Sequence, residues 1–219
     1  MDPIGHKFRF LLHLAGILLL AFISGCIESD ETRSFYIAPD GRVEVVIHWD
    51  NVRSSETEKG PQELEEWFRK VKSGQLEEIK KLKETGAKKV QVTLVRKTVP
   101  YAAVVTATYD SVEAFGRLFD LNREGGEGTI TLEKEGAARR LVFRAAADKT
   151  PPKPKKIRPD DPKNYYPVWK FIPVDGRITQ ADGFLLSEDK RSCLLNLPRL
   201  ERMKRTPEGY FFFIAWNVE

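Results

Sequence analysis

Apolar and polar residues alternate along much of this chain, and two stretches instead carry apolar residues at helical spacing. Alternation with a period of two is typical of half-buried strands, whereas apolar residues at i, i+3 and i+4 indicate an amphipathic helix. The helical spacing covers residues 62–85 and 111–119. Strands are predicted over residues 35–38, 42–49, 89–95, 101–109, 129–133, 140–145, 184–187, 192–195 and 210–218.

Turn and cap residues divide these stretches. Pro39-Asp40-Gly41 lies between the first two strands, as in a hairpin. The helical phase slips at Ser73-Gly74, so residues 62–85 form either two short helices or one kinked helix, with Gly86 as the C-terminal cap. Asp110, three residues before Glu113, has the pattern of a capping box for the next helix.

The predicted order β-β-α-β-β-α-β-β mixes hairpins with helices and indicates an α+β fold with a largely antiparallel sheet and two helical segments. We assign this domain to residues 34–147. Residues 148–164 are rich in Pro and Lys and form an extended connector. The β-rich C-terminal segment, residues 165–219, is expected to pack on the main domain because about 55 residues without a disulfide make a marginal core.

An apolar run covers residues 10–23 and follows a short basic start. As a helix, fourteen residues rise about 21 Å, less than the ~30 Å hydrocarbon core of a bilayer, so the run is typical of a signal peptide. The next residues, Ile23-Ser24-Gly25-Cys26, resemble the lipobox of bacterial lipoprotein precursors. The resemblance implies removal of residues 1–25, a thioether-linked diacylglycerol on Cys26 and acylation of the new amine.

The lipobox resemblance implies an exported protein with a short tether, residues 26–33, between the membrane and the domain. Ile27 follows Cys26 where an aspartate would signal inner-membrane retention in proteobacteria. We therefore expect the outer membrane if the host has one, and otherwise the outer face of the cytoplasmic membrane. Two alternatives remain open: an uncleaved anchor over residues 8–27, and an ordinary secretory signal with a coincidental cysteine.

Charge and composition narrow the function classes. The chain has 36 Lys+Arg and 32 Asp+Glu; removing residues 1–25, which contain Lys7, Arg9 and Asp2, leaves 34 and 31, a net charge of +3. Both signs are mixed along the chain, whereas a nucleic-acid binder usually shows a concentrated basic face. We therefore expect no nucleic acid as a partner.

The side chains that could carry chemistry are few. His48 is the one histidine outside residues 1–25 and lies in a predicted strand, which favours a half-buried structural role. With Cys193 as the other candidate ligand, we expect no metal site and no cofactor. Cys193 lies between apolar residues in a predicted strand and is expected to be a buried thiol.

The expected function is thus a non-catalytic binding, assembly or structural role in the cell envelope. The partners are membrane lipid, through acylated Cys26, and an unidentified envelope protein or polymer. The alternative is a membrane-tethered enzyme that acts on cell-wall or glycan material with paired carboxylates, which are plentiful here.

One group of residues is a candidate contact for an anionic surface. Basic groups near a membrane are attracted to anionic head groups, and aromatic side chains favour the interface. The group comprises Lys153, Lys155, Lys156, Arg158, Tyr165, Tyr166 and Trp169. The favoured interpretation is nevertheless a solvated linker followed by aromatic residues that pack into the core.

The surface contact can be tested by replacing with Gln the six basic residues Lys149, Lys153, Lys155, Lys156, Arg158 and Lys163. Each basic group near the surface contributes ~1 kcal/mol, so an unlipidated chain carrying the six changes should bind anionic vesicles more weakly in a sedimentation assay. Unchanged binding would remove the connector as a contact.

Overall fold

A computed structural model of the chain describes residues 27–55, 60–119, 128–145, 168–195 and 210–219. It confirms a mixed α+β fold in which strands dominate and most pairings are antiparallel. The elements are β1 (Ile27–Ile37), β2 (Val43–Ser54), α2 (Gly60–Ser73), α3 (Glu77–Glu84), β3 (Lys88–Arg96), β4 (Tyr101–Tyr109), α4 (Val112–Gly116), the 3-10 helix η1 (Arg117–Phe119), β5 (Thr129–Glu135), β6 (Ala138–Ala145), β7 (Val168–Pro173), β8 (Gly176–Asp182), β9 (Phe184–Leu186), β10 (Cys193–Leu195) and β11 (Tyr210–Val218).

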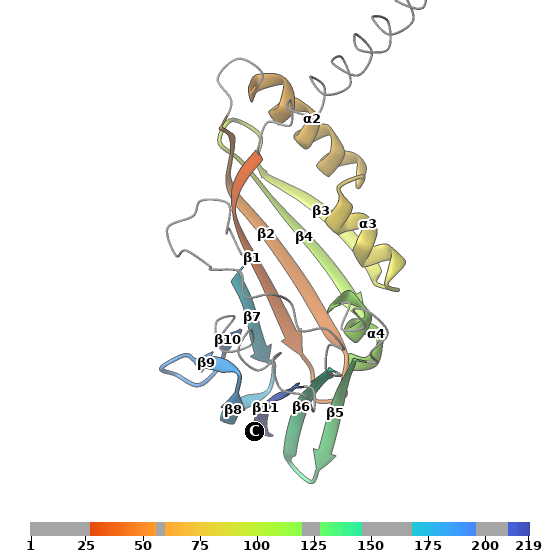
Figure 1. The fold of residues 1–219 in the computed structure, drawn as a ribbon, viewed down its shortest axis with the longest axis vertical. Coiled ribbons are helices and arrows are strands. Elements are labelled where there is room, and N and C mark those ends of the chain that lie inside the picture. Colours follow the sequence, from red (N-terminus) through yellow and green to blue (C-terminus); the bar gives the residue numbers. More distant parts are fainter. Residues whose placement is uncertain (1–26, 56–59, 120–127, 146–167, 196–209) are drawn as a thin grey trace, which may run out of the picture.

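The strands form two sheets rather than one. The larger sheet has the order β3-β4-β2-β1-β7-β10-β9 and the smaller one the order β5-β6-β11-β8. Helices α2 and α3 run along the larger sheet, and the smaller sheet lies at the other end of the long axis (Figure 1). The parallel pair β1–β7 brings the C-terminal segment into the larger sheet, and β11 joins β6 in the smaller one. The segment after residue 167 therefore supplies strands to both sheets.

Strand β1 begins earlier than expected. Residues 27–33, which our sequence analysis assigns to a tether, form its first half and pair with the end of β2. Alternation did not reveal this half because its residues are mostly polar. The ladder to β2 continues through them, and Arg53 Nε donates a hydrogen bond to the Glu28 carboxylate, 3.1 Å away.

Glycines end both helices of the first helical stretch, which confirms two short helices instead of a kinked one. Gly74 and Gly86 have φ values of 67° and 92°, a region that L side chains rarely adopt. After α3 the Gly86 N–H donates to the Lys83 carbonyl and the Ala87 N–H to the Leu82 carbonyl. This paired bonding satisfies carbonyls that the helix end would otherwise leave free.

Helix α4 is capped one residue later than the capping-box pattern suggested. Ser111 is the N-cap, and its hydroxyl oxygen accepts a hydrogen bond from the Ala114 N–H at 3.2 Å. The Asp110 carboxylate instead pairs with Lys88 of β3. The pattern located the start of the helix to within one residue, and Ser111 rather than Asp110 is its cap.

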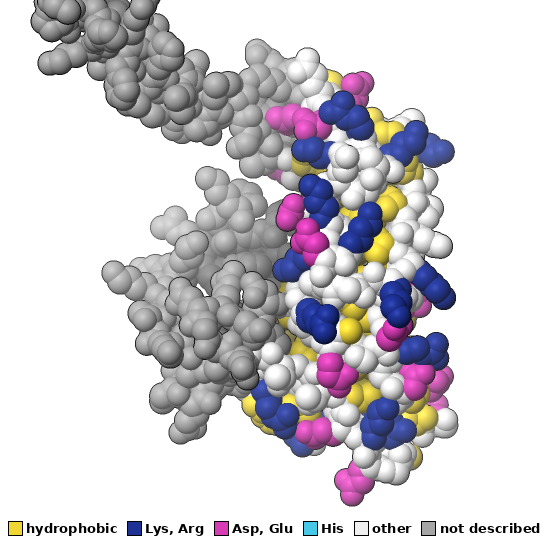
Figure 2. All heavy atoms as spheres, turned by 90° about the vertical axis from the view of Figure 1, so that its right-hand side faces the viewer, with side chains coloured by type: hydrophobic (Ala, Val, Ile, Leu, Met, Phe, Trp, Pro, Cys, Tyr) yellow, Lys and Arg dark blue, Asp and Glu magenta, His cyan; other side chains and the backbone are white. Residues whose placement is uncertain are grey.

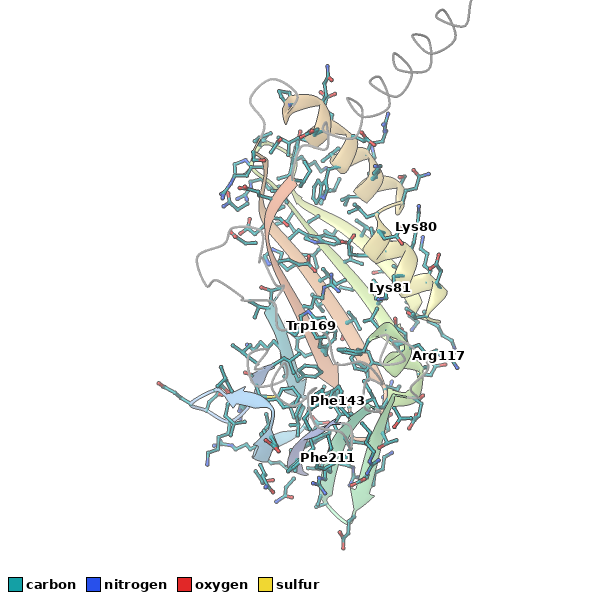
Figure 3. All side chains as sticks on the ribbon, in the orientation of Figure 1. Lys80, Lys81, Arg117, Phe143, Trp169 and Phe211 are labelled. Carbon is teal, nitrogen blue, oxygen red and sulfur yellow. The ribbon has the colours of Figure 1, made fainter. Side chains whose placement is uncertain are left out.

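The apolar faces of α2 and α3 pack on one face of the larger sheet. Leu64, Trp67 and Val71 of α2, with Ile79 and Leu82 of α3, are buried with the inward residues of β2 and β4. The outer face of these helices is charged: Figure 2 shows Lys and Arg interspersed with Asp and Glu there, and in Figure 3 Lys80 and Lys81 lie on α3. The mixture of signs agrees with the modest net charge.

An aromatic cluster joins the two sheets. Phe35 of β1 contacts Phe171 of β7, with ring centroids 4.9 Å apart, and Phe115 of α4 at 5.1 Å. Phe171 in turn meets Phe143 of β6 at 5.6 Å, and Phe143 stacks on Phe212 of β11 at 4.4 Å. Because aromatic pairs add ~0.5–1.5 kcal/mol beyond area burial, this cluster is a major stabilising contact between the sheets.

Two turn glycines provide a matched test of this packing. Gly183 has φ 84°, and a Cβ there would lie 2.9 Å from the Phe212 Cβ; Gly136 has φ 54° and open space around it. Gly136→Ala should cost ~1 kcal/mol of unfolding free energy from backbone strain, and Gly183→Ala a further ~1–3 kcal/mol from overpacking. Urea unfolding measures both. Equal losses would contradict the close contact at Gly183.

Candidate functional site at the start of the first strand

Most residues singled out from the sequence lie outside the described part of the chain. These are Ile23, Ser24, Gly25, Cys26, Lys153, Lys155, Lys156, Arg158, Tyr165 and Tyr166. Trp169 is described, and so is Ile27, the residue that follows Cys26. Within the described ranges, the search for a helix both long and apolar enough to cross a bilayer finds none.

Four strand ends meet where the described chain begins. Ile27 pairs with Ser54 at the end of β2, Val52 pairs with Tyr101 at the start of β4, and Arg96 ends β3 opposite Ala102. The candidate lipid-attachment residue is one peptide unit from this edge, and consecutive Cα atoms are ~3.8 Å apart. We call this end of the larger sheet the β1-start end and define it by Ile27, Ser54, Arg96 and Tyr101.

Two ion pairs at the β1-start end connect different strands: one joins β1 to β2, and the other spans β4 to join β2 to β3. Arg53 bonds Glu28, and Arg96 Nη2 lies 2.6 Å from Asp50 Oδ1. The Asn51 N–H also donates to Asp50 Oδ1 at 2.7 Å. This backbone hydrogen bond, followed by the charge of Arg96, holds the pKa of Asp50 below its usual value. The Asp50 carboxylate therefore stays ionised at neutral pH, with Arg96 as its partner.

Aromatic and polar contacts hold α2 against the same end. Ser54 Oγ donates to the Glu63 carboxylate at 2.8 Å, which connects the end of β2 to the first turn of α2. Trp67 stacks on Tyr101 and meets Trp49 edge-on, each with centroids 6.3 Å apart. Buried rings of this size give a rigid edge, which suits a fixed attachment point.

The carboxyls with displaced pKa values indicate surface pairing. Asp40, Asp50, Glu66 and Asp189 all have lowered pKa values, because each accepts hydrogen bonds from a neighbouring N–H, hydroxyl or ammonium group. A catalytic general acid needs the opposite displacement. These four therefore serve as ionised hydrogen-bond acceptors.

The remaining candidates for chemistry occupy structural positions. His48 is half-buried, as expected, and lies on the other face of the sheet from the buried Ile47 and Trp49. Its cross-strand neighbours are Thr32 in β1 and Val104 in β4. Among the residues that the structure describes, no group of three or more His, Cys, Asp or Glu side chains could hold a metal ion. Cys193 is buried as expected, and burial raises the pKa of its thiol to about 12.

Trp169 packs inward. It is half-buried on β7, with its ring 5.0 Å from Phe119 and 6.2 Å from Phe35, and Figure 3 shows it beside the aromatic cluster. Trp169 pairs with Arg33, about six residues or ~20 Å along β1 from Ile27. This is the core packing that our sequence analysis favours for the aromatic residues, while a surface role for the other six residues of that group stays a prediction.

A cation–aromatic cluster on the smaller sheet was missed from the sequence. The Arg140 guanidinium lies 3.9 Å above the Phe213 ring and 5.4 Å from Phe211, and Glu133 lies within salt-bridge distance of both Arg140 and Arg144. The part of this cluster that the sequence could have revealed is the salt bridge, because the predicted β5–β6 hairpin places Glu133 opposite Arg140. No pattern in the sequence predicted that β11 would pair with β6 and bring Phe211 and Phe213 to Arg140.

Comparisons with known proteins give one structural neighbour. No protein-family model matches the chain, and no curated protein matches it. Among solved structures, the folded domain of the LppM protein of Mycobacterium tuberculosis is similar, with 11% identity and a TM-score of 0.39 over 90% of this chain and 93% of that chain. Both values are too low for this neighbour to indicate a function.

The buried thiol of Cys193 makes a pH-dependent prediction. The thiol keeps its proton in the folded chain up to about pH 12 but loses it near its ordinary pKa of 9.0 when unfolded. The folded state therefore binds more protons between these values, and stability falls as pH rises through that window, by roughly 1.4 kcal/mol per unit. In a Cys26→Ser background, unfolding curves of Cys193 and Cys193→Ala chains should diverge in slope above pH 9. Parallel slopes would contradict a buried protonated thiol.

Proposed function

We propose that this chain is an envelope lipoprotein, anchored through acylated Cys26, whose α+β domain has a non-catalytic binding, assembly or structural role. The single observation that carries the proposal is the sequence Ile23-Ser24-Gly25-Cys26 at the end of a short apolar run, followed directly by a folded strand. An acylated cysteine at this position needs no further anchor, since two or more acyl chains give stable membrane attachment.

The position of β1 supports a domain held close to the lipid. The ladder between β1 and β2 begins at Ile27, so a chain cleaved before Cys26 has almost no linker between its acyl groups and its sheet. A lipoprotein that reaches a distant partner usually needs tens of residues of flexible chain. The proposed partners are accordingly membrane lipid itself and an envelope protein or polymer at the membrane surface.

The side chains support binding over catalysis. The charges at the β1-start end are paired across strands, and the carboxyls with displaced pKa values are acceptors of hydrogen bonds. Paired in this way, Asp50 is held in its ionised form, whereas a general acid must hold a proton to donate. We place the protein outside the cytoplasmic membrane, in the outer membrane of a host that has one and otherwise on the outer face of the cytoplasmic membrane.

The anchor is tested by Cys26→Ala, with Cys193→Ala as the matched control. Loss of the acceptor thiol should abolish acylation and cleavage, so intact-mass measurement of membrane-expressed protein should show an unmodified chain that still carries residues 1–25. The control should begin at Cys26 and carry the mass of the acyl groups.

Two results would overturn the proposal. A wild-type chain that begins at Met1 without acyl mass would indicate an uncleaved anchor. A Cys26→Ala chain processed at the same bond as the wild type would indicate an ordinary secretory signal.

A further inference from the structure

The two most exposed large hydrophobic side chains of the described residues occur in one hairpin. Val95, at the end of β3, is 60% exposed, and Val99, in the turn to β4, is 58% exposed. Burial of an aliphatic side chain is favourable, so two such residues on one hairpin would gain from contact with an apolar phase. Exposed hydrophobic residues scattered singly are common on protein surfaces, so the position of these two in the fold decides what they indicate.

The strand register places this turn at the β1-start end. Arg96 and Tyr101, which flank the turn, lie in the same row of strand ends as Ile27 and Ser54. Figure 1 shows the β3–β4 turn at the same end of the larger sheet as the first residues of β1, with β2 between β4 and β1. The exposed valines and the candidate acylation site therefore share one edge of the molecule, although about 70 residues separate them in the chain.

The polar groups around the turn favour a lipid surface. Arg96 is engaged by Asp50 and by the Pro100 carbonyl, which holds the turn in place. Lys97, between the two valines, is exposed, and a lysine can keep its ammonium at the head groups while its methylenes lie along apolar surface. A pair of aliphatic residues around one lysine thus matches the apolar-to-polar gradient of a bilayer interface.

We propose that the β3–β4 hairpin tip is a second membrane contact, with Val95 and Val99 in the interfacial region of the lipid bilayer beside the acyl chains of Cys26. This inference rests on the proposed function, because acylation at Cys26 is what brings the β1-start end to the bilayer. Together the anchor and the hairpin tip make two points of contact. They fix the tilt of the domain, which a single flexible attachment would leave free.

The test uses the acylated mature chain in vesicles of phosphatidylethanolamine and phosphatidylglycerol. Acylation blocks Cys26 and Cys193 is buried, so Val99→Cys offers a single reactive thiol for an environment-sensitive fluorophore. Val174→Cys is the matched control: Val174 is 52% exposed, and its N–H donates to the Ile37 carbonyl at the opposite end of β1, ~33 Å from Ile27. Val95→Cys provides a second position in the hairpin.

Fluorophores at positions 95 and 99 should shift to shorter wavelength on vesicle binding. Nitroxide-labelled lipids should quench them at least about twofold more than the fluorophore at 174, since interfacial residues lie ~5–10 Å deep. Equal quenching at all three positions in a chain whose acylation is verified by mass would overturn the hairpin contact alone. An unacylated wild-type chain would overturn the proposed function, and the hairpin contact with it. If the fluorescence at positions 95 and 99 shifts to shorter wavelength in native membranes but not in pure lipid vesicles, the hairpin tip contacts a protein and not the bilayer.

Discussion

Strand β1 is hydrogen-bonded on both sides, and the arrangement of the two sheets depends on it. Its antiparallel ladder to β2 runs from Ile27 to Ile37, and its parallel ladder to β7 joins residues more than 130 positions apart in the chain. Phe35 lies in the region of overlap and contacts rings from α4, η1 and β7. Burial of one such ring is worth ~1.5–3 kcal/mol, so this position connects the helices, the larger sheet and, through Phe171 and Phe143, the smaller sheet.

Strand β1 also fixes the distance between the β1-start end and the end of the larger sheet that meets the smaller sheet. A strand of eleven residues spans ~33 Å between its end Cα atoms, and β2 stiffens β1 along its length. The β1-start end and the smaller sheet lie at opposite ends of the long axis (Figure 1), so the proposed acylation of Cys26 would turn the first toward the bilayer and the second away from it. The charged outer faces of α2 and α3 then extend along the side of the domain.

Predictions succeeded where a feature depends on neighbouring residues. Gly74 and Gly86 ended helices because their backbone conformations suit glycine, and Pro39-Asp40-Gly41 turned the first hairpin for a similar local reason. Burial of Cys193 followed from its apolar neighbours. Predictions failed where a distant partner decided the outcome. Residues 27–33 are polar and look like a tether, but β2 supplies a ladder for them. Asp110 pairs with Lys88 of β3, and Ser111 caps the helix.

The sequence by itself determined the order of most strands and helices, the α+β class and the lipobox, since each of these is encoded in contiguous residues. Only the tertiary structure decided that the strands divide into two sheets, that β7 lies parallel to β1, and that Val95 and Val99 lie at the same edge as Ile27. The physical reason is that strand pairing matches backbone groups that every residue carries. The choice among partners is therefore made by the packing of the whole core, and no single stretch of sequence records it.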